Sequence, residues 1–263
     1  MTFLQRTLGR NYKWFYALKY NLNLSLVYII PSLFVIIRDF LPLLVSLIIY
    51  GSFLDAKEFA VYFVISNIFF KLCSTVWDIA WDIRTDLLNG NMTTKLMRPS
   101  NIIGQYFVVT IGANTYSIIV NAVILMAIIP SLGVQIPINI PLLFPSIMMF
   151  FVGFLIFFSV DVLLGSLAFW LKQFAPLIET RSVLFPFLAG ALVLLPTNKF
   201  TSSFAYLPLS FGVYHPTQIY LGKYNQPEII QTFVGGIAWC VILWILARLV
   251  FKAGLKKNEA VGL

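Results

Sequence analysis

The chain has 263 residues, of which 60% are hydrophobic and 11% are charged, and its formal net charge is +8. A mean hydropathy of +0.89 is far above the range of water-soluble domains, and it excludes a soluble enzyme or a soluble binding module. A spanning helix needs about 20 mostly apolar residues, because hydrocarbon offers no partner to an open backbone group. The composition therefore predicts an all-α membrane protein with several spanning helices.

Residues 1–20 precede the first long apolar run. They combine basic side chains such as Arg6 and Arg10 with bulky apolar ones such as Trp14. This mixture is typical of an amphipathic helix in the membrane interface, although a solvated leader has the same composition. Because the segment has no continuous apolar core, we expect no secretory signal peptide.

Six apolar runs follow, and they predict one membrane domain over residues 21–263 with six spans. The runs occupy residues 22–50, 58–77, 101–129, 142–171, 182–196 and 229–250. The fifth run is too short for a straight crossing unless residues 175–178 extend it.

The polar segment 77–99 lies between the second and third runs. In a helix, the spacing of its aspartates places Asp78, Asp82 and Asp86 on one face, beside a face that carries Trp77 and Trp81. We expect a short helix at the membrane surface that shows an acidic ridge to water next to large apolar anchors.

Asn89 and Gly90 predict the end of this helix. One interpretation is a solvated helix whose tryptophans belong to the interfacial aromatic belt. The other is a docking site for a soluble partner, in which aromatic side chains fill a groove and charges set the register. The candidate docking residues are Trp77, Asp78, Trp81, Asp82, Arg84, Asp86 and Arg98.

The third and fourth spans carry polar residues where lipid does not tolerate them. Helical spacing aligns four of these residues in a stripe on the third span: Thr110, Asn114, Ser117 and Asn121. Asp161 lies deep in the fourth span, where an ionisable group costs roughly 3 kcal/mol or more and needs a partner or water. Such residues either bond neighbouring helices or line a wet path, so the candidate translocation residues are Asn114, Ser117, Asn121 and Asp161.

Phenylalanines surround Asp161 in the fourth span at positions 150, 151, 154, 157 and 158. They face either lipid and neighbouring helices or a cavity. An aromatic cavity with few polar groups suits a hydrophobic or amphipathic molecule better than an inorganic ion.

Residues 197–226, between the fifth and sixth spans, alternate short apolar pieces with Pro208, His215 and Pro216. The segment is a candidate extracellular gate, or a loop packed over the helix ends. His215 is the single histidine of the chain, so we expect no metal site there.

Lysine and arginine are distributed unevenly across the predicted loops. With the N-terminus inside, thirteen lie in inner segments, namely Arg6, Arg10, Lys13, Lys19, Arg84, Lys95, Arg98, Lys172, Arg181, Arg248, Lys252, Lys256 and Lys257. Three lie in outer segments, namely Lys57, Lys199 and Lys223. This bias predicts that both termini are cytoplasmic, and it accounts for the positive charge without a nucleic-acid partner.

Three passages together resemble a known family. They are Asp82-Ile83-Arg84 with Leu88, Gly90, Leu96, Arg98 and Pro99; Ala168-Phe169-Trp170; and the segment 215–223 with Trp239 and the basic tail. They are similar in content and order to ABC-2-type transporter permeases, in the branch of ABC-2 family transporter proteins.

The resemblance implies a six-span bundle of the type V exporter kind, with a coupling helix within residues 77–99 and a re-entrant segment within 197–226. It implies a non-catalytic permease in a bacterial cytoplasmic membrane, paired with an identical or different permease subunit and driven by two cytoplasmic ABC ATPase subunits. ATP and magnesium would bind those partners, and this chain would bind no cofactor. The cargo would be a drug, peptide, lipid or glycolipid.

The sequence agrees with a separate motor, because it contains no phosphate-binding P-loop. In the nearest approach, Thr217 stands where the first glycine is required, and Tyr224 follows Gly222 and Lys223. The alternative is a channel or ion-coupled carrier that titrates Asp161. A membrane scaffold or an intramembrane enzyme is a third interpretation, for which no nucleophile and base are apparent.

Overall fold

The computed structural model describes residue 20 and residues 56–114, 139–171, 174–191 and 203–261. Within these ranges all regular secondary structure is helical. Three helical segments there are long and apolar enough to cross a membrane: Val61–Leu88, Ile140–Phe169 and Gln226–Lys257. The described residues agree with the prediction of an all-α membrane protein and contain three candidate spans of the six predicted. The first span, residues 1–19, Ser117 and Asn121 lie outside the described residues.

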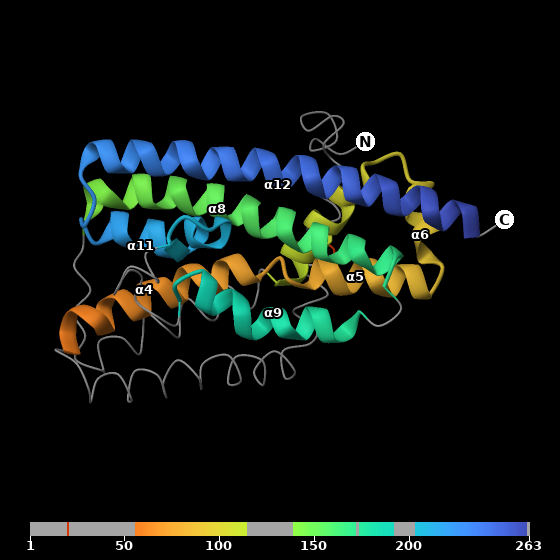
Figure 1. The fold of residues 1–263 in the computed structure, drawn as a ribbon, viewed down its shortest axis with the longest axis horizontal. Coiled ribbons are helices and arrows are strands. Elements are labelled where there is room, and N and C mark those ends of the chain that lie inside the picture. The colour runs from red at the N-terminus through yellow and green to blue at the C-terminus, as the bar shows by residue number, and fades with distance from the viewer. Residues whose placement is uncertain (1–19, 21–55, 115–138, 172–173, 192–202, 262–263) are drawn as a thin grey trace.

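Helix α8 (Ile140–Ser166) is the central element, and the short helix η2 (Leu167–Phe169) extends it. Pro141 in its first turn costs little, because the first helical N–H groups have no partner within the helix. Helix α12 (Gln226–Val261) runs beside α8 in the same direction along most of its length (Figure 1). Gly236 permits this approach, since a Cβ there would lie 2.7 Å from the methyl group of Met149.

Helices α4 (Ala56–Ser74) and α5 (Asp78–Leu88) follow one another along the bundle with a short break between them (Figure 1). Helix α5 lies directly on α8, because a Cβ at Gly165 would be only 2.9 Å from the Cα atom of Ala80. The break at residues 75–77 lets the chain leave the direction of α4 and lie on this part of α8.

Helix α5 ends as the sequence predicts. Asn89 is the C-cap residue, and Gly90 has a φ of 71°, which glycine adopts without strain. The short helix α6 (Asn91–Leu96) follows, and the helix Ile102–Asn114 then turns back along the bundle. This corner lies at the same end of the molecule as the C-terminal end of α12 (Figure 1).

Helix α9 (Ala175–Leu188) corresponds to the short fifth run. It begins at Ala175, so residues 175–178 do extend the run, but the helix has 14 residues, which is fewer than a straight crossing needs. Pro176 occupies its first turn, and Gly190 ends it with a φ of 81°. The earlier start places Arg181 inside the helix, where its side chain is buried.

The segment between α9 and α12 contains the short helices η3 (Pro208–Gly212) and α11 (Tyr214–Tyr220), which pack against α8. Contact is closest at Gly153, where a Cβ would lie 2.1 Å from the Cα atom of Gly212. The hydroxyl of Ser146 also donates to the carbonyl of Pro216 at 2.7 Å.

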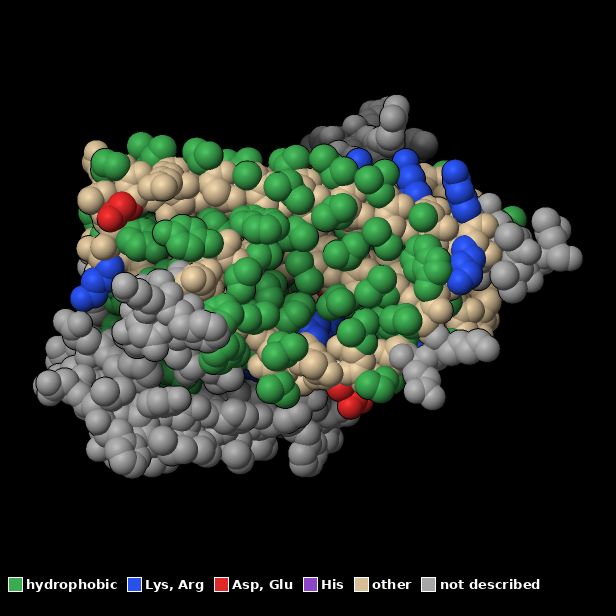
Figure 2. Space-filling model, in the orientation of Figure 1, with side chains coloured by type: hydrophobic (Ala, Val, Ile, Leu, Met, Phe, Trp, Pro, Cys, Tyr) green, Lys and Arg blue, Asp and Glu red, His purple; other side chains and the backbone are tan. Residues whose placement is uncertain are grey.

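Apolar side chains cover the outer faces of α8 and α12. Figure 2 shows them spread across the visible face, with most of the visible Lys and Arg side chains near the end where α12 terminates. Phe144, Phe151 and Leu155 of α8 and Val234 and Ile237 of α12 are each exposed by 45% or more. Such a face is stable against hydrocarbon and not against water.

Candidate functional site

Asp161 lies in the interior of the bundle, where its side chain has no exposed surface. The sequence predicts that a carboxylate at this depth requires a partner, and the partner is Arg181 of α9. The ion pair joins α8 to α9, and each buried charge neutralises the other. Asp161 is therefore a helix-bonding residue in this conformation.

The same pair holds the beginning of α5. The Asp161 carboxylate accepts a hydrogen bond of 2.9 Å from the backbone N–H of Ala80, which is one of the first donors of α5. Trp77, at the N-cap position, makes no capping bond with its side chain, so a carboxylate from another helix supplies one. The Arg181 guanidinium donates to the carbonyl of Trp77 at 2.8 Å and lies 5.0 Å from the centre of its ring.

We call this arrangement of Asp161, Arg181 and the backbone of residues 77–80 the α5 clasp. It connects α8, α9 and α5 within one buried unit. Any movement of α5 along the bundle must break these bonds or carry α8 and α9 with it.

Asp86 lies differently from the predicted acidic ridge. Its side chain is buried, accepts a hydrogen bond of 2.6 Å from the hydroxyl of Tyr106 and forms an ion pair with Lys95. Asp78 is exposed and Asp82 is half-buried. The prediction of an acidic ridge is wrong at Asp86, because α6 and the helix Ile102–Asn114 fold back over the last turn of α5. Sequence periodicity does not reveal this contact.

The remaining predicted docking residues are divided between the interior and the surface. Trp77 packs against the rings of Phe70 and Phe185, so its indole belongs to the core. Trp81 and Arg84 are half-buried and lie over one another, with 5.3 Å from the guanidinium carbon to the ring centre. Arg98 is exposed beyond α6.

Among the exposed apolar residues of this corner, Leu88 and Leu96 belong to the motif of the family resemblance, whereas Met97 was not singled out from the sequence. Met97 is 87% exposed, Leu88 is 69% exposed and Leu96 is 39% exposed. We refer to Leu88, Leu96 and Met97 as the α5–α6 tip. The sequence signal for an exposed apolar corner is that these three residues lie beside charged or turn residues and outside every apolar run.

Asn114 bonds the second and third predicted spans together. Its side-chain amide donates to the carbonyl of Thr75 at 3.0 Å, to the carboxylate of Asp78 at 2.9 Å and to the carbonyl of Thr110 at 3.1 Å. Asn114 is the one candidate translocation residue of the polar stripe that the structure describes. Its side chain bonds neighbouring helices, which is the first of the two roles predicted for the stripe.

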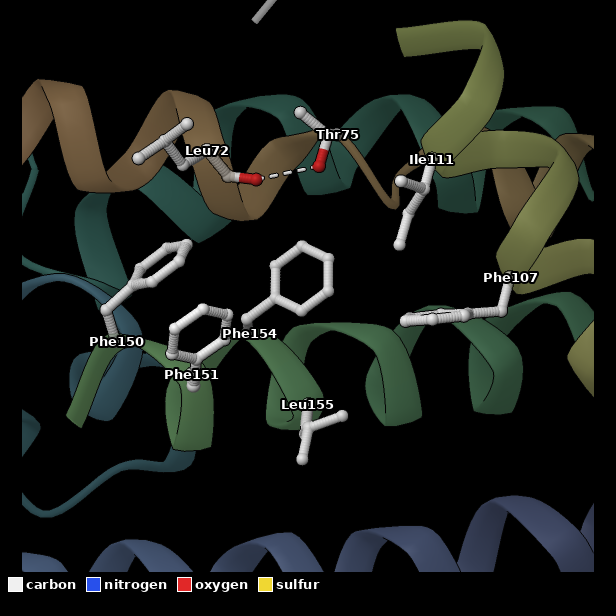
Figure 3. A pocket seen from close by; sticks show the side chains of 8 residues that line it. All are labelled: Leu72, Thr75, Phe107, Ile111, Phe150, Phe151, Phe154 and Leu155. Atoms are coloured by element: carbon white, nitrogen blue, oxygen red, sulfur yellow. Dashed lines mark hydrogen bonds between the residues drawn. The ribbon is translucent and has the colours of Figure 1, made fainter. Parts of the chain in front are cut away.

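An apolar pocket of about 360 Å³ lies between α4, the helix Ile102–Asn114 and α8 (Figure 3). Its walls are formed by Leu72, Thr75, Phe107, Ile111, Phe150, Phe151, Phe154 and Leu155. Three of the five phenylalanines around Asp161 therefore line a pocket. The other two, Phe157 and Phe158, belong to the buried core.

The predicted gate residues lie in the packed segment between α9 and α12. Pro208 is half-buried, whereas His215 and Pro216 are buried. His215 donates from Nε2 to the carbonyl of Ala205 at 2.8 Å and accepts at Nδ1 from the hydroxyl of Tyr224 at 2.9 Å. Burial lowers the pKa of His215 to about 4, so the ring is neutral at physiological pH.

Within the described residues, no group of three or more His, Cys, Asp or Glu side chains is arranged to hold a metal ion. The polar groups of the bundle bond helices to one another. Its distinctive surfaces are the apolar outer faces, the apolar pocket and the α5–α6 tip.

A comparison with known families agrees with this description. The family model for the ABC-2 family transporter protein matches residues 54–262. The chain belongs to the ABC-2 transporter family. Comparisons with curated proteins and with solved structures give no match.

Membership confirms the resemblance of the sequence to ABC-2-type permeases and identifies the chain as a membrane-embedded permease. ABC-2 permeases are typically the non-catalytic membrane component of an ABC transporter, whose ATPase is a separate subunit. The matched region includes every described element from α4 to α12, and so includes the α5 clasp, the α5–α6 tip and the pocket.

Proposed function

We propose that this ABC-2 permease is the membrane subunit of an ATP-driven exporter, in which a cytoplasmic ATPase docks on the α5–α6 tip. The observation that carries the proposal is the exposure of Leu88, Leu96 and Met97 at one end of the bundle. Apolar side chains exposed to water at a protein corner favour a partner that covers them. Arg98 and the half-buried Asp82 supply charges beside them that set the register of docking.

The basic end of α12 supports a cytoplasmic location for the tip. Helix α12 has 36 residues, or about 54 Å at 1.5 Å per residue, which exceeds the roughly 30 Å of hydrocarbon. Its last turns carry exposed Lys252, Lys256 and Lys257 and lie at the same end of the molecule as α6 (Figure 1). Positively charged ends of spanning helices prefer the cytoplasmic side, so we propose that this end and both termini lie on the cytoplasmic side of a bacterial inner membrane.

The α5 clasp connects the proposed docking site to helices in the interior of the bundle. A push on the tip acts on α5, and the clasp links the first turn of α5 to α8 and α9. In this proposal, ATP and magnesium bind two ATPase subunits, and their closure displaces α5 and tilts the spans of two paired permease subunits. The paired subunit is a second copy of this chain or a related permease.

The cargo in this proposal is hydrophobic or amphipathic. The long described helices carry few polar side chains that would coordinate an inorganic ion. Residues 203–226 pack over α8 at the end opposite the α5–α6 tip, where we propose the extracellular gate with Pro208, His215 and Pro216.

Co-purification tests the motor. The wild-type chain, isolated from its own cells in a mild detergent, is expected to bring down an ATPase subunit that mass spectrometry identifies. Asp82→Lys and Met97→Gln are each expected to reduce the recovered ATPase at least tenfold without changing the amount of permease in the membrane. Recovery of the ATPase at the wild-type level in both variants would contradict docking at the tip.

Matched controls sit at the other end of the bundle. Glu228→Lys makes the same charge change as Asp82→Lys at an exposed acid in the first turn of α12. Tyr206→Gln replaces another large side chain, 74% exposed, as Met97→Gln does. Both controls are expected to retain the ATPase.

Transport in proteoliposomes separates the exporter from the ion-coupled carrier. The exporter requires ATP and the ATPase, and compounds that it carries stimulate ATP hydrolysis. A carrier works without any ATPase, follows the proton gradient and loses its pH dependence in Asp161→Asn. Transport of the second kind would replace the present proposal.

A further inference from the structure

The pocket between α4, the helix Ile102–Asn114 and α8 has walls that present only carbon to its interior. The one polar side chain in its wall is Thr75, and its hydroxyl donates to the carbonyl of Leu72 at 2.7 Å (Figure 3). Rings from two helices face the space, with Phe107 on one side and Phe150 and Phe154 on the other. A pocket of this kind does not hold water, because a buried water needs two to four polar partners.

The pocket opens on the lipid-facing side of α8. Phe151 and Leu155 line it and are nevertheless 54% and 45% exposed, so they form its rim. They continue the row of exposed apolar side chains that begins at Ile140. Phe151 is eleven residues from Ile140, or about 16 Å along the helix, which is close to the middle of a bilayer. The solvent at the mouth is therefore hydrocarbon.

Size and chemistry restrict the occupant. A helix from another subunit is about 10 Å wide and does not fit a pocket of about 360 Å³. A specifically recognised cargo requires polar groups that orient it, and these walls provide none. A flexible hydrocarbon chain fits both limits, and it adds dispersion contacts on the ring surfaces that line the pocket.

We propose that this pocket is a binding site for one acyl chain of a membrane phospholipid. The chain enters from the bilayer past Phe151 and Leu155 and fills the space between α4 and α8. Binding of the lipid does not depend on the proposed transport function, so either proposal can fail without the other.

The site lies beside the start of α5. Thr75 is in the break that separates α4 from α5, and its carbonyl accepts the hydrogen bond from Asn114. A chain wedged against Thr75 sets the spacing between α4, the helix Ile102–Asn114 and α8. Where the transport proposal also holds, the length and unsaturation of the acyl chains will change the rate of ATP hydrolysis.

Photolabelling tests the site directly. A phosphatidylglycerol with a diazirine at the end of one acyl chain is added to the full-length protein in mild detergent, and labelled peptides are identified after illumination. We expect label on residues 150–155 and 72–75, reduced at least fivefold by excess unlabelled phosphatidylglycerol. Label on the exposed face of α12 is expected to be weaker and not to compete.

A rim variant and a matched control complete the test. Leu155→Trp narrows the mouth at a residue that is 45% exposed, and Leu246→Trp makes the same change on α12 at a residue that is 44% exposed. Only Leu155→Trp is expected to reduce the competed label, by at least fivefold, while both variants keep the wild-type melting temperature. Equal labelling of the two helices, or competed labelling that survives Leu155→Trp, would overturn the proposal.

Discussion

Arg181 and Asp161, twenty residues apart in the chain, form an ion pair that is closed to solvent and that also holds the first turn of α5. Each charge alone would be unstable in the apolar interior, and each makes a second bond to the backbone near Trp77. The pair is thus a structural connection between three helices, and it accounts for an acidic residue in the fourth span without a role in ion transport.

Removal of one partner of this pair is expected to cost much more than removal of both. Arg181→Met and Asp161→Leu each leave a buried charge unpaired, and we expect each to lower the free energy of unfolding by about 3 to 5 kcal/mol. The double variant leaves no buried charge and is expected to recover most of this loss. Unfolding in mixed detergent and SDS micelles measures all three, and a double variant as unstable as the singles would contradict the assignment.

Gly153 is predicted to be essential for the contact of η3 with α8. A Cβ at this position would lie 2.1 Å from the Cα atom and 2.4 Å from the nitrogen of Gly212, and backbone atoms have little freedom to withdraw. Gly153→Ala should therefore destabilise the protein by about 1 to 3 kcal/mol, measured as a lower melting temperature in detergent.

Gly235→Ala is the control for this change in α12, where the new Cβ would meet the ring of Phe211 at an ordinary 3.4 Å. It should be neutral or slightly stabilising, since alanine favours a helix more than glycine does. Similar losses in the two variants would show that the close approach at Gly153 is not the cause.

Tyr106 is expected to stabilise the corner formed by α5 and α6. Tyr106→Phe removes the hydroxyl that donates to the buried Asp86 carboxylate, a charge-assisted bond worth roughly 1.5 to 3 kcal/mol. Faster hydrogen exchange in residues 86–97 is the expected readout. Tyr206→Phe deletes the same hydroxyl from a side chain that is 74% exposed, and exchange in residues 86–97 should not change in this control.

The buried, neutral ring of His215 is expected to make the folded protein less stable in mild acid. Burial holds its pKa at about 4 in the folded protein, against about 6.5 in the unfolded chain. Between these values the unfolded chain binds more protons, so the contribution of His215 is complete above pH 6.5 and decreases as the pH falls toward 4. We expect a loss of roughly 2 kcal/mol at pH 5 relative to pH 8.

The measurement for His215 is the free energy of unfolding at the two pH values in wild type and in His215→Gln, which does not titrate. The variant is expected to be less stable at pH 8 because it packs less well, but to lose less on acidification. An equal loss in the two proteins would assign the acid sensitivity to other groups.

The sequence by itself determined the membrane class, three of the predicted spans and the end of α5 at Asn89 and Gly90. These features depend on local properties, namely the hydropathy of about 20 neighbouring residues and the freedom of glycine at positive φ. It also indicated the family, because the motif residues stand in a fixed order along the chain.

Only the tertiary structure decided which polar groups meet. The sequence predicts a partner for Asp161, but it places Arg181 in an inner segment, whereas the structure pairs the two residues. The sequence also predicts that Asp86 faces water, whereas Tyr106 and Lys95 enclose its side chain in the structure. These outcomes depend on which helices lie side by side, and hydrophobic periodicity gives the buried face of a helix without naming the neighbour that covers it. The pocket has the same origin, because its walls come from three helices whose contacts join residues far apart in the chain.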